Sequence, residues 1–404
     1  MRIFKILTLA VAVFAVAAGT VPLLAQAQRG DSNEPGRKIV VFANDLSDEA
    51  KDVIIRDVGA AKIKHLQRAR ASVMMLDRAG LEKLRRNPNV LRIDDDVIVT
   101  ALETGERIER TARGGTGTLA QPIEVLPWGI ERVNANDVWG TTTTDPVKVA
   151  ILDTGIDLSH PDLKANIKGQ YNAISPWQSV KDGNGHGTHV AGIIAAIDNT
   201  VGVIGVAPKA DLYAVKVLNN NGSGYLSDII EGLDWAIAKG IKVVNMSLGT
   251  VSDIQSFHDA IVRAYNAGIV LVAAAGNAYG GAVNYPAAYS EVIAVSATDS
   301  NNNLASFSSV GPQVDIAAPG ASIYSTYKNS SYATMSGTSM ASPHTAGVAA
   351  LLLSVPSKCD ADASGSCSPA EVQARLETTA HDLDASGKDF QYGSGLVDAY
   401  AALQ

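Results

Sequence analysis

The chain has 404 residues, enough for one large domain with a smaller unit beside it, and 46% of them are hydrophobic. Its formal charge of −8 is unevenly distributed. Residues 1–120 carry 19 basic and 15 acidic side chains (net +4), and residues 121–404 carry 14 and 26 (net −12). This acidic main body excludes binding to nucleic acid, which needs clustered Lys and Arg. It suits the binding of cations and of a basic N-terminal segment.

Residues 1–27 are typical of a secretory signal peptide. Two basic residues precede an apolar run over 6–18, and Ala25 and Ala27 offer the small side chains that a signal peptidase requires. The apolar run is too short to span a bilayer. We therefore expect cleavage after Ala27 and a secreted, extracellular protein without a membrane anchor.

The chain has only two cysteines, Cys359 and Cys367, which are separated by seven residues in a Ser/Gly/Asp-rich segment. In an exported protein this spacing favours a disulfide that closes a small surface loop. Two free thiols are the alternative.

Residues 28–102 have the pattern of a small independent unit. The sequence predicts strands over 38–42, 71–76, 90–93 and 97–100, and helices over 47–58 and 81–86. This alternation suggests an α+β, ferredoxin-like βαββαβ sandwich. Residues 103–120 are first charged and then Gly-rich, which predicts a linker open to proteolysis.

Residues 121–404 are predicted to form one large α/β domain. Near-continuous apolar runs, as expected for strands covered on both faces, occupy 147–152, 212–218, 242–246, 269–274, 292–297 and 314–317. Helical patterns occupy 186–197, 227–239, 257–266, 338–354 and 369–379, and residues 324–336 have the composition of a loop. We expect a mostly parallel central sheet with helices on both faces. Such sheets place functional sites at the carboxyl ends of their strands.

Three polar side chains fall at the ends of predicted elements. Asp153 follows a buried strand, His186 begins a helix between glycines, and Ser339 begins a long apolar helix. A serine hydroxyl is a poor nucleophile unless an imidazole removes its proton, and a buried carboxylate must orient that imidazole. Asn277 follows another strand, where its amide can donate to an oxyanion. These residue types predict nucleophilic acyl transfer.

A zinc site is the competing interpretation, because His186 and His189 share one face of a helix. The zinc-peptidase pattern needs two His four residues apart with a Glu between them, and here Gly187 and Thr188 intervene. The sequence shows no third ligand at an obvious spacing, so we favour acyl transfer.

Three motifs resemble the signatures of the subtilisin family of serine peptidases. They are Asp-Thr-Gly at 153–155, His-Gly-Thr-His-Val-Ala-Gly at 186–192, and Gly-Thr-Ser-Met-Ala-Ser-Pro at 337–343. The order Asp, His, Ser distinguishes this family from others with the same triad. The resemblance covers Pro127 to the C-terminus and implies hydrolysis of polypeptide substrates. It implies that Asp153, His186 and Ser339 are orienter, general base and nucleophile, and that Asn277 and the Ser339 N–H form the oxyanion hole.

The resemblance also implies where a substrate binds. The family adds its substrate as an extra strand, and pockets beside that strand set the side-chain preference. Small residues on the walls and an uncharged floor residue, Asn284, imply a roomy and mostly apolar first pocket, hence a preference for large apolar or aromatic side chains. The implied substrate-binding residues are Gly222, Ser223, Gly224, Ser247, Leu248, Gly249, Ala274, Ala275, Gly276 and Asn284.

A structural Ca²⁺ is a further implication of the resemblance. Oxygen ligands of the kind a hard cation prefers would come from Asp162, Asn199 and the carbonyls of Ile197, Val201 and Val203. The N-terminal ligand stays open between Gln121 and Glu124, and an Asn/Gly turn without an ion is the alternative. The resemblance also points to a second, weaker cation position near Ala287, Tyr289 and Asp315, but we do not predict an ion there.

Residues 28–102 resemble the propeptide that serves this family as folding assistant and inhibitor. Its final strand, ending near residues 98–102, would lie in the cleft like a product. This implies self-cleavage at a bond between about Thr100 and Gln121, followed by release of a compact domain that we expect to be a monomer.

Two other functions compete with a broadly specific peptidase. A dedicated processing peptidase usually carries acidic pockets for basic side chains, and none is evident in the sequence. A catalytically inactive binding protein on the same fold would be expected to lack a triad residue or the oxyanion Asn, yet all four are present.

Overall fold

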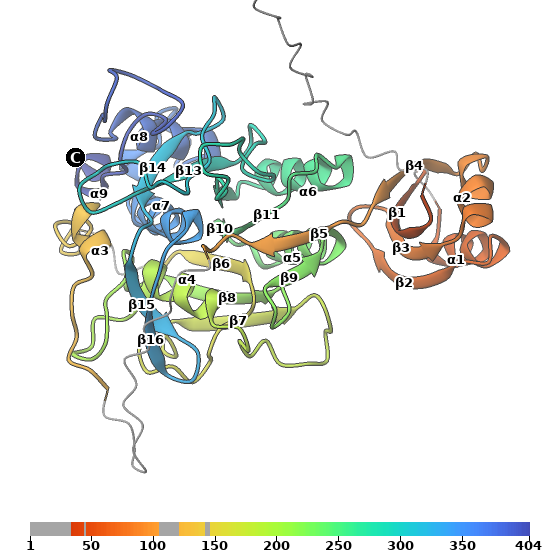
Figure 1. Cartoon of the computed structure of the whole chain (residues 1–404), viewed down its shortest axis with the longest axis horizontal. Coiled ribbons are helices and arrows are strands. Elements are labelled where there is room, and N and C mark those ends of the chain that lie inside the picture. Colours follow the sequence, from red (N-terminus) through yellow and green to blue (C-terminus); the bar gives the residue numbers. More distant parts are fainter. Residues whose placement is uncertain (1–33, 44–45, 105–120, 142–145) are drawn as a thin grey trace, which may run out of the picture.

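The computed structural model describes residues 34–43, 46–104, 121–141 and 146–404 (Figure 1). The predicted signal peptide and residues 105–120 of the predicted linker fall outside these ranges. Among the described residues, no helix combines the length and the apolar character that crossing a membrane requires.

The N-terminal unit has the predicted βαββαβ order. Its antiparallel sheet has the strand order β2-β3-β1-β4. Both helices begin at a side-chain cap, where Ser47 and Asp77 each accept a backbone N–H three residues on. Strand β2 has no counterpart among the predicted elements, because its sequence is largely charged and exposed. The elements are β1 (Gly36–Phe42), α1 (Asp48–Asp57), β2 (Ala61–Leu66), β3 (Ala71–Leu76), α2 (Arg78–Arg85) and β4 (Val90–Asp95).

The main domain is built on a seven-stranded sheet in which every neighbouring pair of strands is parallel. The strand order is β14-β13-β12-β10-β6-β8-β7, which confirms the predicted α/β class. Six of these strands coincide with the predicted apolar runs to within two residues at each end. The strands are β6 (Lys148–Asp153), β7 (Ile167–Asn172), β8 (Asp211–Lys216), β10 (Val243–Met246), β12 (Val270–Ala274), β13 (Ile293–Thr298) and β14 (Ile316–Pro319).

Helices cover both faces of this sheet (Figure 1). On one face α4 (His186–Ala195) and the long α7 (Thr338–Leu353) pack in one buried apolar cluster. On the other face α5 (Leu226–Lys239) and α6 (Gln255–Asn266) pack in a second one. The remaining helical segments are α3 (Trp128–Arg132), η1 (Pro356–Lys358), α8 (Pro369–Thr378) and α9 (Ala399–Leu403).

The order of the strands reverses at β6. After β6 the chain forms β7 and then β8 on one side of β6, with β8 as its neighbour. It then crosses to the other side of β6 and forms β10, β12, β13 and β14 in that order. Parallel sheets open a crevice at such a reversal, outside the carboxyl ends of the adjacent strands. Asp153 is the last residue of β6, and Ser247 directly follows β10. The fold therefore directs polar residues from distant segments to one place.

The predicted loop over 324–336 is wrong. These residues form most of a hairpin of β15 (Ile323–Tyr327) and β16 (Ser331–Met335). Tyr, Ser and Thr suit a pleated strand when neighbours pair with it. The hydroxyls of Ser325 and Thr326 donate to the carbonyls of His189 and Thr188, so the hairpin covers the first turn of α4.

The end of the N-terminal unit enters the main domain as a strand. Strand β5 (Ile98–Ala101) lies between β9 (Ser223–Tyr225) and β11 (Leu248–Gly249) and pairs antiparallel with both. In Figure 1 this strand bridges the two bodies of the molecule.

Two carboxylates of the N-terminal unit also cap helices of the main domain. Neither α5 nor α6 has a side-chain cap of its own. Asp96 accepts the backbone N–H and the hydroxyl of Ser227 in the first turn of α5, both at 2.8 Å. Asp94 accepts the same two groups of Ser256 in the first turn of α6. Carboxylates satisfy the free N–H groups of a helix start and its positive dipole end.

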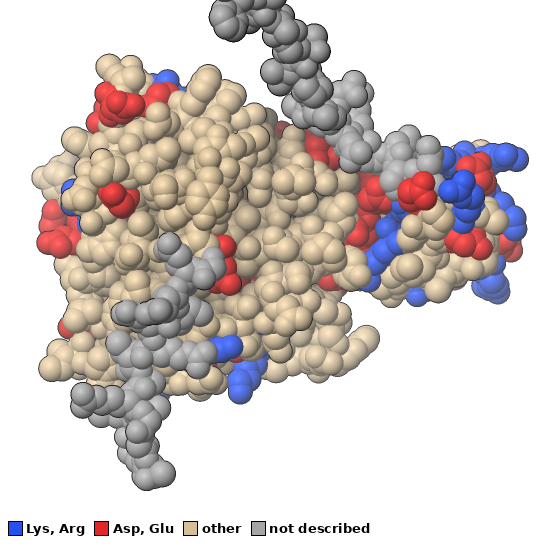
Figure 2. Space-filling model, viewed as in Figure 1, with Lys and Arg blue, Asp and Glu red and all other residues tan. Residues whose placement is uncertain are grey.

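Charge complementarity accompanies this docking. Lys64 of β2 pairs with Asp228 at 2.5 Å and with Glu231 at 2.6 Å, both on α5. On the face drawn in Figure 2, Lys and Arg side chains gather on the N-terminal unit, and acidic side chains lie at its junction with the main domain. The basic N-terminal and acidic main-domain charges noted in the sequence thus meet at this interface.

Candidate active site

Asp153 and His186 form a buried pair. The His186 Nδ1 lies 2.8 and 2.9 Å from the two carboxylate oxygens of Asp153, and both side chains are fully buried. The Thr154 N–H donates to the same carboxylate at 2.6 Å. A proton on Nδ1 satisfies the carboxylate and leaves Nε2 as the lone-pair nitrogen. The structure therefore brings the first two predicted residues together, and the carboxylate favours the Nδ1–H tautomer of the neutral imidazole, which proton abstraction needs.

The electrostatic surroundings of His186 favour its charged form. Burial lowers the pKa of the imidazole, but the charge and hydrogen bond of Asp153, together with the charges of Glu103 and Asp182, raise the pKa to about 9. An imidazole that gains a proton during a reaction is stabilised by these same charges.

Ser339 lies in the first turn of α7, where its side chain meets the N-terminal unit. Its hydroxyl donates to the Ser247 carbonyl at 3.0 Å and accepts the Leu102 N–H at 3.1 Å. His186 Nε2 is buried and has no hydrogen-bond partner among the described residues. The Ser339–His186 hydrogen bond is thus not formed in this structure, and a rotation of the serine side chain is needed to make it. Apo geometries of catalytic hydrogen bonds are commonly loose in this way.

The carbonyl of Leu102 lies near the two predicted oxyanion donors. The backbone N–H of Ser339 donates to this oxygen at 3.3 Å. A Cβ added to Gly337 would come 2.6 Å from the same oxygen and 3.4 Å from Asn277 Nδ2, so both groups lie beside Gly337. Asn277 Nδ2 is buried and has no partner among the described residues. Of the two predicted oxyanion donors, the Ser339 N–H thus binds this carbonyl, and the Asn277 amide lies nearby without a hydrogen bond to it.

Thr338 fixes the orientation of the Asn277 amide, a role that sequence reasoning missed. Its N–H and its hydroxyl both donate to Asn277 Oδ1 at 3.0 Å, and the hydroxyl accepts the Gly276 N–H at 3.1 Å. With Oδ1 held this way, Nδ2 points into the site. In the sequence, the only indication of this role is that Thr338 directly precedes Ser339 in the motif.

The residues predicted to bind substrate hold the segment 98–104. Val99 pairs with Gly224 and Thr100 with both Ser223 and Gly249. Beyond the strand, the Thr104 N–H donates to the Ser336 carbonyl at 3.0 Å. The chain thus runs through the cleft on both sides of Ser339.

Leu102 occupies the predicted first pocket. Its side chain is 9% exposed, and a Cβ added to Gly249 would come 3.0 Å from Leu102 Cδ1 and 3.1 Å from Asn284 Cβ. Gly276 is equally close to the Asn284 side chain, and Asn284 N–H donates to the Ala275 carbonyl at 2.8 Å. Gly249 therefore lies against an apolar side chain, next to the predicted floor residue Asn284.

The loop predicted to bind calcium is folded around Asp162. This carboxylate is fully buried and accepts Asn199 Nδ2 and the Val203 N–H, both at 3.0 Å. Glu124 accepts the Asn199 N–H at 2.8 Å, whereas the Gln121 Oε1 is buried without a partner among the described residues. The buried Gln121 Oε1 is an acceptor without a donor, and it lies beside the loop around the Asp162 carboxylate. A cation would supply the missing positive partner, so the residues present fit a Ca²⁺ ion with Gln121 as a ligand.

Two further predictions concern the edges of the main domain. Cys359 and Cys367 form a disulfide with a Cα–Cα distance of 5.5 Å. Near the weaker cation position, Asp315 pairs with the Lys388 ammonium at 2.7 Å, so a cationic side chain already neutralises that carboxylate. Among the described residues, only Asp360, Asp362 and Glu371 bring three potential metal-ligand atoms together, so His186 and His189 have no such third ligand.

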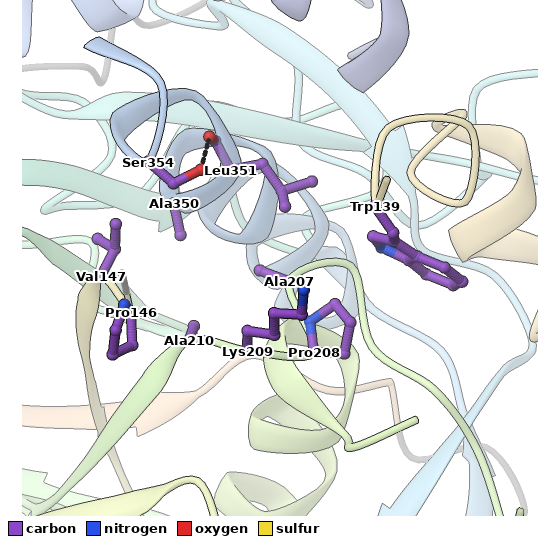
Figure 3. A pocket seen from close by; sticks show the side chains of 10 residues that line it. All are labelled: Trp139, Pro146, Val147, Ala207, Pro208, Lys209, Ala210, Ala350, Leu351 and Ser354. Carbon is purple, nitrogen blue, oxygen red and sulfur yellow. Dashed lines mark hydrogen bonds between the residues drawn. The ribbon is translucent and has the colours of Figure 1, made fainter. Parts of the chain in front are cut away.

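An apolar hollow lies far from this cleft (Figure 3). It is lined by Pro146 and Val147 before β6, by Trp139, and by the last turns of α7. Val147 directly precedes strand β6, and Asp153 is the last of the six residues of that strand. A strand rises about 3.3 Å per residue, so about 20 Å separate the hollow from the Asp153 carboxylate. The hollow takes no part in the chemistry at Ser339.

Comparison with known proteins agrees with this geometry. The profile described as "Subtilase family" matches residues 144–395. The chain is 41% identical over 399 residues to the "Minor extracellular protease Epr" of Bacillus subtilis, an alignment that covers 95% of this chain and 58% of that protein. It is 41% identical over 394 residues to the "Thermostable alkaline protease" of Halalkalibacterium halodurans, covering 95% of this chain and 97% of that protein. It is 49% identical over 280 residues to "Subtilisin Savinase" of Lederbergia lenta, covering 69% of this chain and 99% of that protein.

The matched profile spans more than half of the chain and includes Asp153, His186, Asn277 and Ser339. The chain belongs to the subtilase family and is a serine endopeptidase.

Proposed function

We propose that the chain is a secreted endopeptidase, made as a precursor that hydrolyses its own Leu102–Glu103 bond. The observation that carries this proposal is the Leu102 carbonyl, which accepts the Ser339 N–H at 3.3 Å while its side chain fills the first pocket. A strand held on both sides orients the bond for attack, and orientation supplies a large part of catalysis.

The reaction follows from the groups around Leu102. The Ser339 hydroxyl turns from the Ser247 carbonyl to His186 Nε2, gives up its proton and attacks the carbonyl carbon. The oxyanion is held by the Ser339 N–H and by Asn277 Nδ2, and Asp153 stabilises the imidazolium. His186 then protonates the departing Glu103 nitrogen, and water hydrolyses the acyl-enzyme at Leu102. Loss of the Asn donor costs about 3 kcal/mol, a magnitude measured on subtilisin and carried over here.

The same geometry supports inhibition by residues 28–102. The cleaved strand β5 keeps its pairing to β9 and β11, and Asp94 and Asp96 keep α6 and α5 capped. A cleaved N-terminal unit therefore blocks the cleft until it unfolds or is degraded. Its core is small, so docking on α5 and α6 stabilises it.

Activity requires a neutral His186. Because the pKa of His186 is raised to about 9, the neutral form dominates only above that pH while Glu103 lies beside it. After cleavage of the Leu102–Glu103 bond, movement of the new N-terminus at Glu103 away from the cleft would remove one of the charges that raise this pKa. Self-cleavage of the precursor should therefore be faster at alkaline pH than at neutral pH.

Export is supported by the predicted signal peptide and by the name of the Bacillus subtilis relative. We further propose that the mature enzyme is a monomer that acts on polypeptides and binds neither nucleic acid nor a membrane. The net charge of −12 over residues 121–404 supports the exclusion of nucleic acid.

Replacing the nucleophile tests the proposed mechanism. Ser339→Ala removes the attacking oxygen, so peptidase activity should fall about a million-fold, a magnitude known from subtilisin itself. The variant should accumulate as the full precursor without its signal peptide, and the wild type should release a fragment that ends at Leu102. Intact mass spectrometry measures both.

Ser354→Ala, at the other end of α7, is the matched control and should be processed normally. Normal processing of purified Ser339→Ala, or a wild-type fragment that ends elsewhere, would contradict the assignment.

The pocket around Leu102 supports a preference for large apolar or aromatic side chains, with otherwise broad cleavage. Small residues line the pocket walls, and Asn284 contributes no charge at the floor. In the full-length chain, Leu102→Phe should therefore preserve self-cleavage, and Leu102→Lys should slow it at least 10-fold because a buried ammonium lacks a partner there. The lifetime of the precursor on a gel measures both rates.

A dedicated processing peptidase for basic residues predicts the opposite order. Faster cleavage of the Leu102→Lys precursor would establish that alternative and reject ours.

We also propose one structural Ca²⁺, held by Asp162, Asn199, Gln121 and the carbonyls of Ile197, Val201 and Val203. When bound, the ion links the segment at Gln121 to the loop around Asp162 and so stabilises the folded state. The unpartnered Gln121 Oε1 supports Gln121 over Glu124, whose carboxylate is already bound to the Asn199 N–H.

Chelation tests the ion. Saturation at 100 times the dissociation constant adds about 2.7 kcal/mol to the free energy of unfolding, so EDTA should lower the melting temperature by several degrees. Gln121→Ala should reduce this calcium-dependent increment, and Glu124→Gln should leave it. An unchanged melting temperature in EDTA would favour the turn without an ion, and the reverse order of the two variants would favour Glu124.

A further inference from the structure

A second buried carboxylate lies next to the Asp153–His186 pair. Asp182 is 1% exposed and accepts five hydrogen bonds. Its Oδ1 accepts the Thr154 hydroxyl at 2.9 Å and the Asn184 and Gly185 N–H groups at 2.9 and 2.8 Å. Its Oδ2 accepts the N–H and the hydroxyl of Thr188 at 2.9 and 2.6 Å. No ion pair of Asp182 occurs among the described residues, so hydrogen bonds from four residues satisfy this carboxylate inside the fold.

These bonds join the two elements that carry the pair. Thr154 directly follows Asp153, and its hydroxyl donates to Asp182 and accepts the N–H of Gly187, directly after His186, at 2.9 Å. The backbones are in close contact, because a Cβ on Gly187 would come 2.2 Å from the Gly155 carbonyl. The end of β6 and the start of α4 are therefore fixed to one another through Asp182 and Thr154.

Asp182 also completes the start of α4. The N-cap of this helix is Gly185, which has no side chain to offer. Asp182 accepts the N–H groups of Gly185 and Thr188, Asn184 Oδ1 accepts that of His186 at 3.0 Å, and Thr154 accepts that of Gly187. The first four N–H groups of α4 are thus all bound by side chains, two of them by Asp182.

We propose that Asp182 is a positioning residue for the peptidase reaction, which fixes His186 against Asp153 and supplies a second buried negative charge to the imidazolium. This inference rests on the proposed role of His186 as general base. If the inference about Asp182 failed, the role of His186 as general base would stand, because His186 and Ser339 are tested by their own substitutions.

Charged groups on every neighbouring element bear on His186. Asp153 on β6, Asp182 on the preceding loop and Glu103 of the N-terminal unit favour the imidazolium. Lys216 on β8 donates to the Thr154 carbonyl and offsets part of the Asp153 and Asp182 charges. His189 on α4 is neutral, because burial lowers its pKa to about 3. Removing Asp182 therefore shifts His186 toward its neutral form.

Asp182→Asn tests this role in the processed enzyme, with a peptide anilide as substrate and active sites counted by fluorophosphonate titration. The kcat should fall about 10-fold with little change in KM, since hydrogen bonds to a charged group are lost. The acid limb of the kcat/KM profile should move to lower pH. Asp157→Asn is the matched control, because Asp157 is 5% exposed and accepts bonds from Ser159 and Ser330 instead. The control should leave the acid limb in place.

Thr154 provides a second test that keeps the Asp182 charge. Thr154→Val removes the bridging hydroxyl and should lower kcat without moving the acid limb, and Thr154→Ser should restore kcat. An acid limb that stays in place in Asp182→Asn, or that moves equally in Asp157→Asn, would overturn the proposal. Equal kcat values for Thr154→Val and Thr154→Ser would overturn it as well, even if Asp182→Asn failed to fold.

Discussion

The contact between the Asp153 carboxylate and the His186 imidazole is the interaction on which the rest of the site depends. Both groups are fully buried, so neither would tolerate burial without the other. The pair fixes the tautomer of the imidazole and leaves Nε2 directed at the cleft. Asp182 and Lys216 then balance the local charge, and the hairpin β15–β16 covers the helix that carries His186.

The N-terminal unit is complementary to this site at three levels. Its last strand completes a three-stranded sheet with β9 and β11, its carboxylates at Asp94 and Asp96 cap two helices, and Leu102 fills the first pocket. Each contact uses a group of the main domain that is otherwise unsatisfied: a strand edge, a helix start or an apolar cavity. The contacts that we propose to be inhibitory therefore also lie along the substrate cleft, as the proposed role of a folding assistant requires.

Much of this architecture could be predicted from the sequence, for definite physical reasons. Strands β6, β10 and β12 are buried on both faces and so appear as unbroken apolar runs, and the three motifs at Asp153, His186 and Ser339 lie at element ends. Strand β7 was missed because it lies at the sheet edge and alternates exposed with covered residues, which weakens the apolar signal. The hairpin at 323–335 was missed because its Tyr, Ser and Thr residues form a strand only when α4 supplies partners.

Other features depend on contacts that no local pattern encodes. The trans-capping of α5 and α6 joins residues more than 130 positions apart, and the buried Gln121 Oε1 without a partner, on which our proposed calcium ligand rests, is visible only in the fold. Asp182 lies four residues before the motif that begins at His186, and the role that we propose for it depends on contacts through Thr154 that the sequence does not show.

The central claim is that Ser339 is a nucleophile activated by His186, with its own N–H and the Asn277 amide as donors to the oxyanion. The most direct measurement is labelling of the processed enzyme with a fluorophosphonate, followed by peptide mapping. The account predicts one adduct per chain, located on Ser339 and abolished by His186→Ala. An adduct on another residue, or labelling of Ser339 that persists at the same rate without the imidazole, would contradict it.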